Sequence, residues 1–377
     1  MNWKKELIAA GFAALMVAQL MGCSAKANDE TTAKAAEKTT ATATTAAAEA
    51  VKSSAATDPV TGEVYPEVVN VALIEGGPES AILSEKKYLD ELDVKVNVVT
   101  YSAGTDINNA IVSGDVDVAS FGSSPVALGI ANKIPYKAVF VPYVQGGNIE
   151  ALVAKNETGA KTVADLKGKT IAAPFGTTSH YALLNALELA GLGASDVTLL
   201  DMGGQDIVAA WTRGDIDAAY IWSPALDECR KDGSILINDG ELAEQGVLIP
   251  EIAVAADGFA EKYPTLVSQY VYALIKANQL VNDSPQEAVA AVAAWEGISE
   301  ESAKGQIDDN IWVSGEEQLE DTYLGTSEKK GSLADTLKTI ADFHQSQGNI
   351  KAAPDRETVE KAIDPSFAQL ALKNHSK

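Results

Sequence analysis

The sequence is poor in the residues that catalysis and covalent cross-linking need. Its 377 residues include two cysteines and three histidines. Cys229 is the one cysteine beyond the N-terminal segment, so we expect no internal disulfide and interpret it as a buried small side chain. His180, His344 and His375 lack the spacing of metal ligands. Phosphate-loop, dinucleotide and Gly-x-Ser-x-Gly signatures are also absent from the sequence, which therefore predicts no enzyme and no cofactor or metal.

Positive charge is scarce as well. There are 29 Lys and Arg residues against 53 Asp and Glu, a formal net charge of -24. This balance argues against nucleic acid and anionic membrane surfaces as partners. It does not exclude a small anion, because backbone dipoles at a helix N-terminus decide affinity at close range.

The N-terminus carries a targeting signal. Lys4 and Lys5 precede an apolar run, residues 7–21, which is shorter than the roughly 20 apolar residues of a membrane span. The run ends in Leu20-Met21-Gly22-Cys23, which resembles the lipobox of bacterial lipoproteins. That resemblance implies that residues 1–23 are a lipoprotein signal peptide and that Cys23 is diacylated. A secretory signal with a chance cysteine, or an uncleaved anchor, are the alternatives.

A low-complexity stretch follows. Residues 24–62 are dominated by Ala, Thr, Lys, Glu and Ser. Such a segment buries too little apolar surface to offset its ordering entropy, so we predict a flexible stalk. The folded body would then lie outside the cytoplasm, tethered by lipid to the outer face of the cytoplasmic membrane or in the periplasm.

An internal repeat indicates the architecture. Residues 104–119 and 204–219 each contain an amphipathic helix, a glycine stop and Gly-Asp-x-Asp leading into a short apolar strand. Each copy continues to a Ser-Pro pair, at 124–125 and 223–224. Two similar α/β units predict two facing lobes, with a ligand beyond the carboxyl ends of the strands.

The rest of the body fits this α/β plan. A strand at 68–74, a helix at 79–92 and a strand at 94–99 form a βαβ unit. We interpret the apolar strands 151–154 and 252–255 as the two crossovers between lobes. Lobe 1 then comprises 63–152 and 253–377, and lobe 2 comprises 153–252. Long helices are predicted to cover lobe 1, at 264–281, 285–295 and 333–347.

Hydrogen-bond donors follow the carboxyl ends of three predicted strands. The run 175–180 lies between a strand and a helix, and its hydroxyl and N–H groups form a potential anion site. One of its hydroxyls is expected to be an ordinary helix cap. Residues 122–125 and 222–224 supply further donors and an aromatic wall. His180 fits a capping or packing role as well as it fits a ligand contact.

These same residues resemble a known family. Gly122-Ser123-Ser124-Pro125, the run 174–181 and the run 209–224 resemble the taurine-binding branch of a solute-binding family of bacterial ABC importers, across about 68–348. The wider family binds nitrate, alkanesulfonates and pyrimidine precursors of thiamine. The resemblance implies a periplasmic-binding-protein type II-like α/β fold. It also implies a monomeric receptor that closes on its ligand and delivers it to a permease and an ATPase subunit.

The resemblance also implies site residues. Ser123, Ser124, Thr177 and Thr178 match donors to a sulfonate, and Trp222 would pack the alkyl link. Glu251 falls where the family has an Asp that pairs with an ammonium group, and Asn148 and Glu150 match an Asn-x-Glu-Ala-Leu run. The end of the first predicted strand, Ile74-Glu75-Gly76-Gly77, lacks the family's pattern of polar residues. Taurine or a related small sulfonate is the predicted ligand; nitrate, a pyrimidine or another zwitterion is the alternative, and a transferase-type surface enzyme is a third hypothesis.

Overall fold

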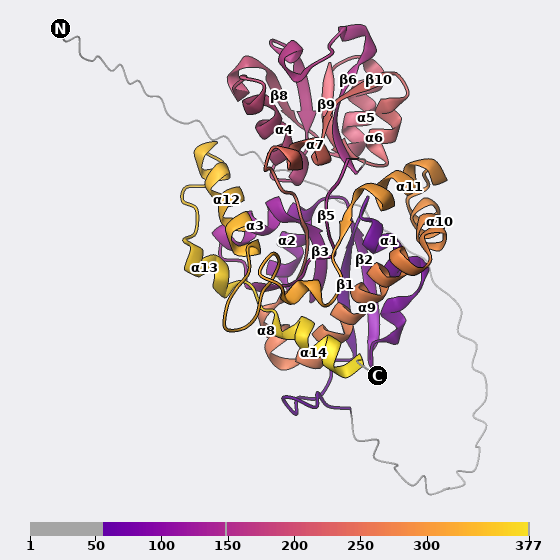
Figure 1. Cartoon of the computed structure of the whole chain (residues 1–377), viewed down its shortest axis with the longest axis vertical. Coiled ribbons are helices and arrows are strands. Elements are labelled where there is room, and N and C mark those ends of the chain that lie inside the picture. Colours follow the sequence, from indigo (N-terminus) through magenta and orange to yellow (C-terminus); the bar gives the residue numbers. More distant parts are fainter. Residues whose placement is uncertain (1–55, 148, 376–377) are drawn as a thin grey trace, which may run out of the picture. The chain divides into compact units, whose positions relative to one another are not determined.

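Two five-stranded sheets form the framework of the chain (Figure 1). The structure is a computed structural model that describes residues 56–147 and 149–375. The predicted signal segment with Cys23, residues 24–55 of the predicted stalk and Asn148 lie outside the described residues. The last part of the predicted stalk, residues 56–62, is not flexible: Asp58 is fully buried and accepts the Thr265 N–H at 2.9 Å. Among the residues described, no helix is both long and apolar enough to cross a membrane.

The first sheet is mostly parallel and belongs to lobe 1. Its order is β2 (Lys95–Tyr101), β1 (Val68–Ile74), β3 (Val118–Gly122), β11 (Glu251–Ala256), β4 (Tyr136–Phe140). Strands β2, β1 and β3 are parallel, and β11 is antiparallel to both of its neighbours. Strands β3 and β11 are almost wholly buried, which explains their near-continuous apolar sequences.

The second sheet repeats this topology in lobe 2. Its order is β8 (Thr198–Asp201), β7 (Thr170–Ala173), β9 (Ala218–Trp222), β6 (Glu150–Lys155), β10 (Gly233–Asn238). Again three strands are parallel and the fourth is antiparallel to its neighbours. The predicted duplication is therefore confirmed, and it extends over all five strands of each sheet.

The repeated Gly-Asp-x-Asp motif has the same role in both lobes. Helix α2 (Gly104–Ser113) ends at Gly114 with φ 82°, and α5 (Gly204–Arg213) ends at Gly214 with φ 80°, the left-handed conformation that favours glycine. The last Asp of each motif then ties neighbouring strands together. The Asp117 carboxylate accepts the Asn70 N–H at 2.8 Å, and Asp217 accepts the Thr170 N–H at 2.8 Å.

Helices cover both sheets. Lobe 1 adds α1 (Pro78–Glu85) and α3 (Ser123–Ala131), and lobe 2 adds α4 (Thr178–Leu189), α6 (Ala225–Arg230) and α7 (Asp239–Glu244). The C-terminal part of the chain, together with the two-stranded pairing of β5 (Tyr143–Val144) and β12 (Ile311–Trp312), completes lobe 1. Its helices are α8 (Asp257–Lys262), α9 (Pro264–Asp283), α10 (Pro285–Glu296), α11 (Glu300–Asp309), α12 (Leu333–Ser346), α13 (Arg356–Lys361) and α14 (Ser366–His375).

Most predicted elements lie within two residues of the observed ones, but the predicted helix at 79–92 is too long. Helix α1 ends at Glu85, Lys87 adopts a left-handed conformation with φ 56°, and a 3-10 turn follows at Tyr88–Glu91. Helical periodicity continues through the sequence there, but a left-handed residue interrupts the backbone ladder.

The chain crosses between lobes beside, rather than within, the two predicted crossover strands. The predicted boundaries at 152/153 and 252/253 cut through β6 and β11, whereas hydrogen bonding keeps each strand whole within one sheet. The crossings lie between β5 and β6 and between α7 and β11. They run side by side: Val144 bridges to Pro250, and the Gln145 N–H donates to the Ile249 carbonyl at 2.9 Å.

Candidate ligand-binding site

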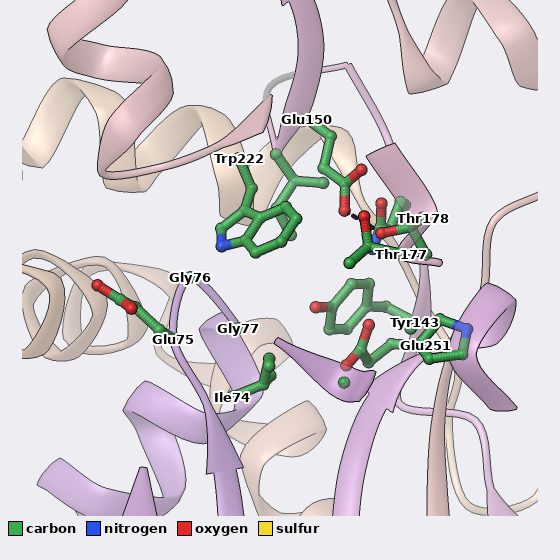
Figure 2. Close-up of a pocket in the computed structure, with 15 residues that line it drawn as sticks. Ile74, Glu75, Gly76, Gly77, Tyr143, Glu150, Thr177, Thr178, Trp222 and Glu251 are labelled. Carbon is green, nitrogen blue, oxygen red and sulfur yellow. Dashed lines mark hydrogen bonds between the residues drawn. The ribbon is translucent and has the colours of Figure 1, made fainter. Parts of the chain in front are cut away.

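A small cavity lies where the strand exits of the two sheets meet (Figure 2). Its volume is about 40 Å³. By the same measure a single water needs about 10–15 Å³, so the cavity suits a small ligand. Residues of both lobes and of the first crossing line it: Ile74, Glu75, Gly76, Gly77, Gly104, Gly122, Pro125, Tyr143, Gln145, Ile149, Glu150, Thr177, Thr178, Trp222 and Glu251.

Four helix N-termini converge on this cavity. Gly77 is the N-cap of α1, Gly104 begins α2, Gly122 is the N-cap of α3 and Thr177 is the N-cap of α4. First-turn N–H groups have no partner within their helix and carry the positive end of the helix dipole. The cavity therefore offers oriented donors to an anionic group.

Glycines let the lobes approach each other here. A Cβ atom on Gly76 would lie 2.5 Å from Cδ1 of Trp222, and a Cβ on Gly122 would collide with the Thr178 methyl group. Gly76 and Gly122 belong to lobe 1, whereas Trp222 and Thr178 belong to lobe 2. A side chain at either glycine would hold the two walls of the cavity apart.

Two buried carboxyl groups, one from each lobe, face the cavity. Glu150 begins β6 and Glu251 begins β11, and each is 3% exposed. The hydroxyls of Thr178 and Ser179 donate to Glu150, the latter at 2.9 Å. Oε1 of Glu251 is buried and has no hydrogen-bond partner among the described residues. An unpaired buried carboxylate is costly, so this oxygen is poised for a donor from outside the chain.

The environment raises the pKa of both groups. Burial raises the pKa of Glu150 to about 7, although hydrogen bonds from Thr178, Ser179 and Gln145 oppose the rise. Burial, followed by the charges of Glu79 and Glu150, holds the pKa of Glu251 well above its usual range, while a hydrogen bond from Gln145 lowers it. Gln145 belongs to the first crossing, so its amide links carboxyl groups of both lobes.

A third carboxyl group adjoins the site. Glu79, in the first turn of α1, is 0% exposed, and its Oε2 has no partner among the described residues. Its carboxyl group lies against the lining residue Gly77. Burial raises the pKa of Glu79, and hydrogen bonds from Ser120 and Tyr143 lower it.

The described lining itself contains three carboxylic acids, Glu75, Glu150 and Glu251, and no Lys or Arg. Among the described residues no group of His, Cys, Asp and Glu side chains is placed to hold a metal ion. The lining itself therefore supplies no cation to pair with these acids. A molecule carrying both an anionic group and a protonated amine would satisfy the helix N-termini and the carboxyl groups together.

Five of the predicted site residues line the cavity: Glu150, Thr177, Thr178, Trp222 and Glu251. The two threonine hydroxyls are already engaged, because Thr177 donates to the Pro174 carbonyl at 2.6 Å and Thr178 donates to Glu150. Their backbone N–H groups lie at the N-cap and first residue of α4, where they have no partner within that helix.

The structure places Ser123, Ser124 and His180 beside the cavity rather than on its lining. Ser124 Oγ lies 2.8 Å from Nε2 of His344, and both residues are fully buried. Ser123 is also fully buried, and its N–H donates to the Pro250 carbonyl. These two serines join the start of α3 to α12 and to the second crossing.

His180 takes the packing role that the sequence left open. Its ring stacks on Phe175 with centroids 4.2 Å apart, and its Nδ1 accepts the Gly176 N–H at 3.3 Å. Burial lowers its pKa to about 4, so the ring is neutral at physiological pH.

Several residues of the site could not be predicted from the sequence, among them Tyr143 and Gln145 on the lining and Glu79 beside it. Tyr143 and Gln145 lie in a stretch with no periodic pattern, so no local signal points to them. Glu79 is an acidic residue in the first helical turn, a position that acidic residues commonly occupy for reasons of helix stability alone. Only the long-range arrangement of the lobes distinguishes it.

Comparison with known proteins identifies relatives. A family model described as NMT1/THI5 like matches residues 82–288. A taurine-binding periplasmic protein of Escherichia coli (strain K12) is 31% identical over 284 residues, which cover 73% of this chain and 85% of that protein.

Solved structures show the same fold. The alkanesulfonate-binding protein SsuA from Xanthomonas axonopodis pv. citri, bound to MOPS, matches with a TM-score of 0.63 and 21% identity, covering 79% of this chain and 98% of that one. The periplasmic aliphatic sulphonate binding protein SsuA from Escherichia coli matches with a TM-score of 0.61 and 22% identity, covering 78% and 92%. The predicted fold class, a two-lobed periplasmic-binding-protein fold, is confirmed.

Proposed function

The chain belongs to the NMT1/THI5-like family, and from this premise we propose that it is an extracytoplasmic binding protein that captures taurine or a closely related aminoalkanesulfonate for an ABC importer. The relatives reported above are described as binding proteins, which confirms the prediction that the chain is not an enzyme. A permease and an ATPase subunit would be its partners.

One observation carries the choice of ligand. Oε1 of Glu251 is buried and has no hydrogen-bond partner among the described residues. Glu251 lines the small cavity, and the described lining has no Lys or Arg. An ammonium group on the ligand would pair with this oxygen and offset the cost of burying it. A ligand without a positive charge would leave the carboxyl group uncompensated.

The anionic half of the ligand has a separate partner. A sulfonate stays ionised and offers three acceptor oxygens, which suit the first-turn N–H groups at the start of α4 and at the turn before α1. Trp222 would cover the short alkyl link and exclude water. The N–H groups and the Glu251 carboxyl group are both satisfied only by a ligand that carries a sulfonate and an ammonium group together.

The expected affinity has an upper bound. A ligand of taurine's size has about 7 heavy atoms, and the best small ligands gain about 1.5 kcal/mol per atom, which gives about -10 kcal/mol. This bound corresponds to a dissociation constant of tens of nanomolar. Reaching it requires burial on all sides, which closure of the lobes would supply.

Isothermal titration calorimetry of the chain without residues 1–23 tests this function. We expect taurine to bind at least about tenfold more tightly than ethanesulfonate, which lacks the amine, or ethylamine, which lacks the sulfonate. Nitrate should bind weakly. If none of these molecules binds to the folded protein, the proposed ligand class is wrong.

Glu251→Gln separates the proposal from its main alternative. The amide cannot neutralise an ammonium group, so taurine affinity should fall at least about tenfold, since charged hydrogen bonds contribute about 1.5–3 kcal/mol. An unchanged affinity for a ligand found in a wider screen would instead favour an uncharged molecule such as a pyrimidine.

We also propose that Cys23 is lipidated and tethers the protein to the cell membrane. The support is the lipobox-like segment before it, together with the double acylation that stable anchoring needs. Cys23→Ser should release the protein from the membrane fraction of expressing cells. A membrane fraction unchanged by this substitution would contradict the anchor.

A further inference from the structure

Trp222 stands between two cavities of very different size. It ends β9, and it lines both the small cavity of about 40 Å³ and a neighbouring cavity of about 520 Å³. Glu75 is the other described residue on both linings. The larger cavity is bordered by the start of α5 at Gly204 and by Pro224 and Ala225.

The partition forms only when both lobes contribute. The Trp222 indole belongs to lobe 2 and is seated on Gly76 of lobe 1, where a Cβ atom would lie 2.5 Å from Cδ1. Gly76 has φ 80°, which places its backbone in the left-handed region that glycine adopts readily. Figure 2 shows the indole above the Gly76–Gly77 turn, between Glu75 and Glu150.

The indole is also next to the carboxyl group of Glu150. Glu150 and Trp222 are direct cross-strand partners in the β6–β9 pairing. Side chains of directly opposed residues lie on the same face of a sheet, with Cβ atoms about 4.5–5.5 Å apart. An amine held by the carboxyl groups would therefore have the indole as its neighbour, and a substituent on that amine would meet Trp222.

We propose that Trp222 sets the size limit of the ligand by walling off the larger cavity, so that the site accepts a short primary amine and rejects the same molecule carrying a bulky N-substituent. This inference rests on the proposed function and deepens it. Removal of the indole would join the two cavities and open room for the substituent.

The larger cavity also defines which substituents would fit. Its described lining carries Glu75, Asp206 and Glu228 and no Lys or Arg. A neutral or cationic extension would be tolerated there, whereas a second anionic group would be repelled. N-cyclohexyltaurine is a suitable probe, because it keeps the two-carbon sulfonate and a protonated amine and adds an apolar ring.

The test is calorimetric titration of taurine and N-cyclohexyltaurine into the wild type and Trp222→Ala. We expect the wild type to prefer taurine by about 100-fold or more, and the variant to reduce this preference at least about tenfold, with tighter binding of N-cyclohexyltaurine. Trp222→Phe should give an intermediate preference. Trp295→Ala is the matched control, because Trp295 lines another cavity but not the small one. The preference of this variant for taurine over N-cyclohexyltaurine should equal that of the wild type.

The outcomes distinguish the size limit from the function on which it rests. If the wild type binds taurine and Trp222→Ala weakens both ligands equally, the size limit is wrong while the proposed function stands. If the wild type binds neither ligand, the proposed function fails and the size limit falls with it. Circular dichroism and thermal unfolding verify that each variant is folded.

Discussion

Glu150 and Glu251 are held where an ionised carboxyl group is unfavourable without a partner. Each begins a strand that follows a crossing, and each is buried at the point where the lobes meet. Burial raises the pKa of both. Above those pKa values the free protein therefore loses stability by keeping these acids ionised, and the amine of the proposed ligand would offset that loss.

Glu150→Gln should stabilise the free protein at pH 8. Because the pKa of Glu150 rises from 4.5 to about 7 on folding, the folded state binds the proton more tightly. Its contribution to stability is full below pH 4.5 and is lost as the pH rises through 7, a difference of up to about 3 kcal/mol. Urea unfolding should show the variant to be more stable than the wild type at pH 8 but not at pH 4. Glu63→Gln, at an exposed position, serves as the matched control substitution. Equal effects of Glu150→Gln at both pH values would contradict the account.

Ligand binding should depend on pH in the opposite sense. Between pH 5 and 8 the sulfonate stays ionised and the amine stays protonated, so any change must come from the protein. As the pH falls below about 7, Glu150 takes up a proton and the pair with Glu251 loses negative charge. Taurine affinity should therefore fall toward pH 5, by at most about tenfold per pH unit for each proton involved. A flat profile in calorimetry from pH 5 to 8 would rule out participation of this pair.

At the scale of secondary-structure elements, the repeated helix–glycine–strand unit could be recognised from the sequence. Each of its signals depends on residues that lie close together in the chain. A glycine that ends a helix and an Asp that ties adjacent strands need specific residues at fixed spacing, as at Gly114 and Asp117. The partners that complete the cavity are different. Tyr143 and Gln145 belong to no periodic pattern, and Ser124 could be distinguished from a ligand donor only through His344, which is distant in sequence.

The two helix-ending glycines should be energetically equivalent. A Cβ atom on Gly114 or Gly214 would meet nothing within 4 Å, so the cost of Ala comes from the positive φ alone. We expect Gly114→Ala and Gly214→Ala each to lower the free energy of unfolding by about 1 kcal/mol. Gly258→Ala, in α8 with equally open surroundings and no positive φ, should be neutral or stabilising by about 0.5 kcal/mol. Chemical denaturation measures all three, and opposite effects at the two repeat positions would contradict their equivalence.

On the scale of the whole molecule, the cavity exists because the lobes touch. Further contacts join the lobes: the Ser302 hydroxyl of α11 donates to Asp227 of α6 at 2.8 Å, and the rings of Tyr181 and Phe343 lie 5.2 Å apart. The Trp222–Gly76 contact closes a further side. Two adjacent crossings are the only links of the chain between the lobes among the described residues, an arrangement that suits hinge motion.

Gly76→Ala should prevent full closure. The new methyl group would collide with Trp222 and with the Ser223 carbonyl. In small-angle X-ray scattering, saturating taurine should reduce the radius of gyration of the wild type but not of this variant. Gly62→Ala is a matched control, because Gly62 has a similar φ of 78° and a Cβ atom added there would meet nothing within 4 Å. If Gly76→Ala compacts as the wild type does, the turn at Gly76 does not limit closure.

The most direct measurement is a crystal structure of the protein with taurine. The account predicts the ligand in the small cavity between the lobes, with its ammonium nitrogen about 3 Å from the Glu251 carboxylate and its sulfonate at helix N-terminal N–H groups. Taurine bound outside this cavity, or with its amine remote from both Glu150 and Glu251, would contradict it.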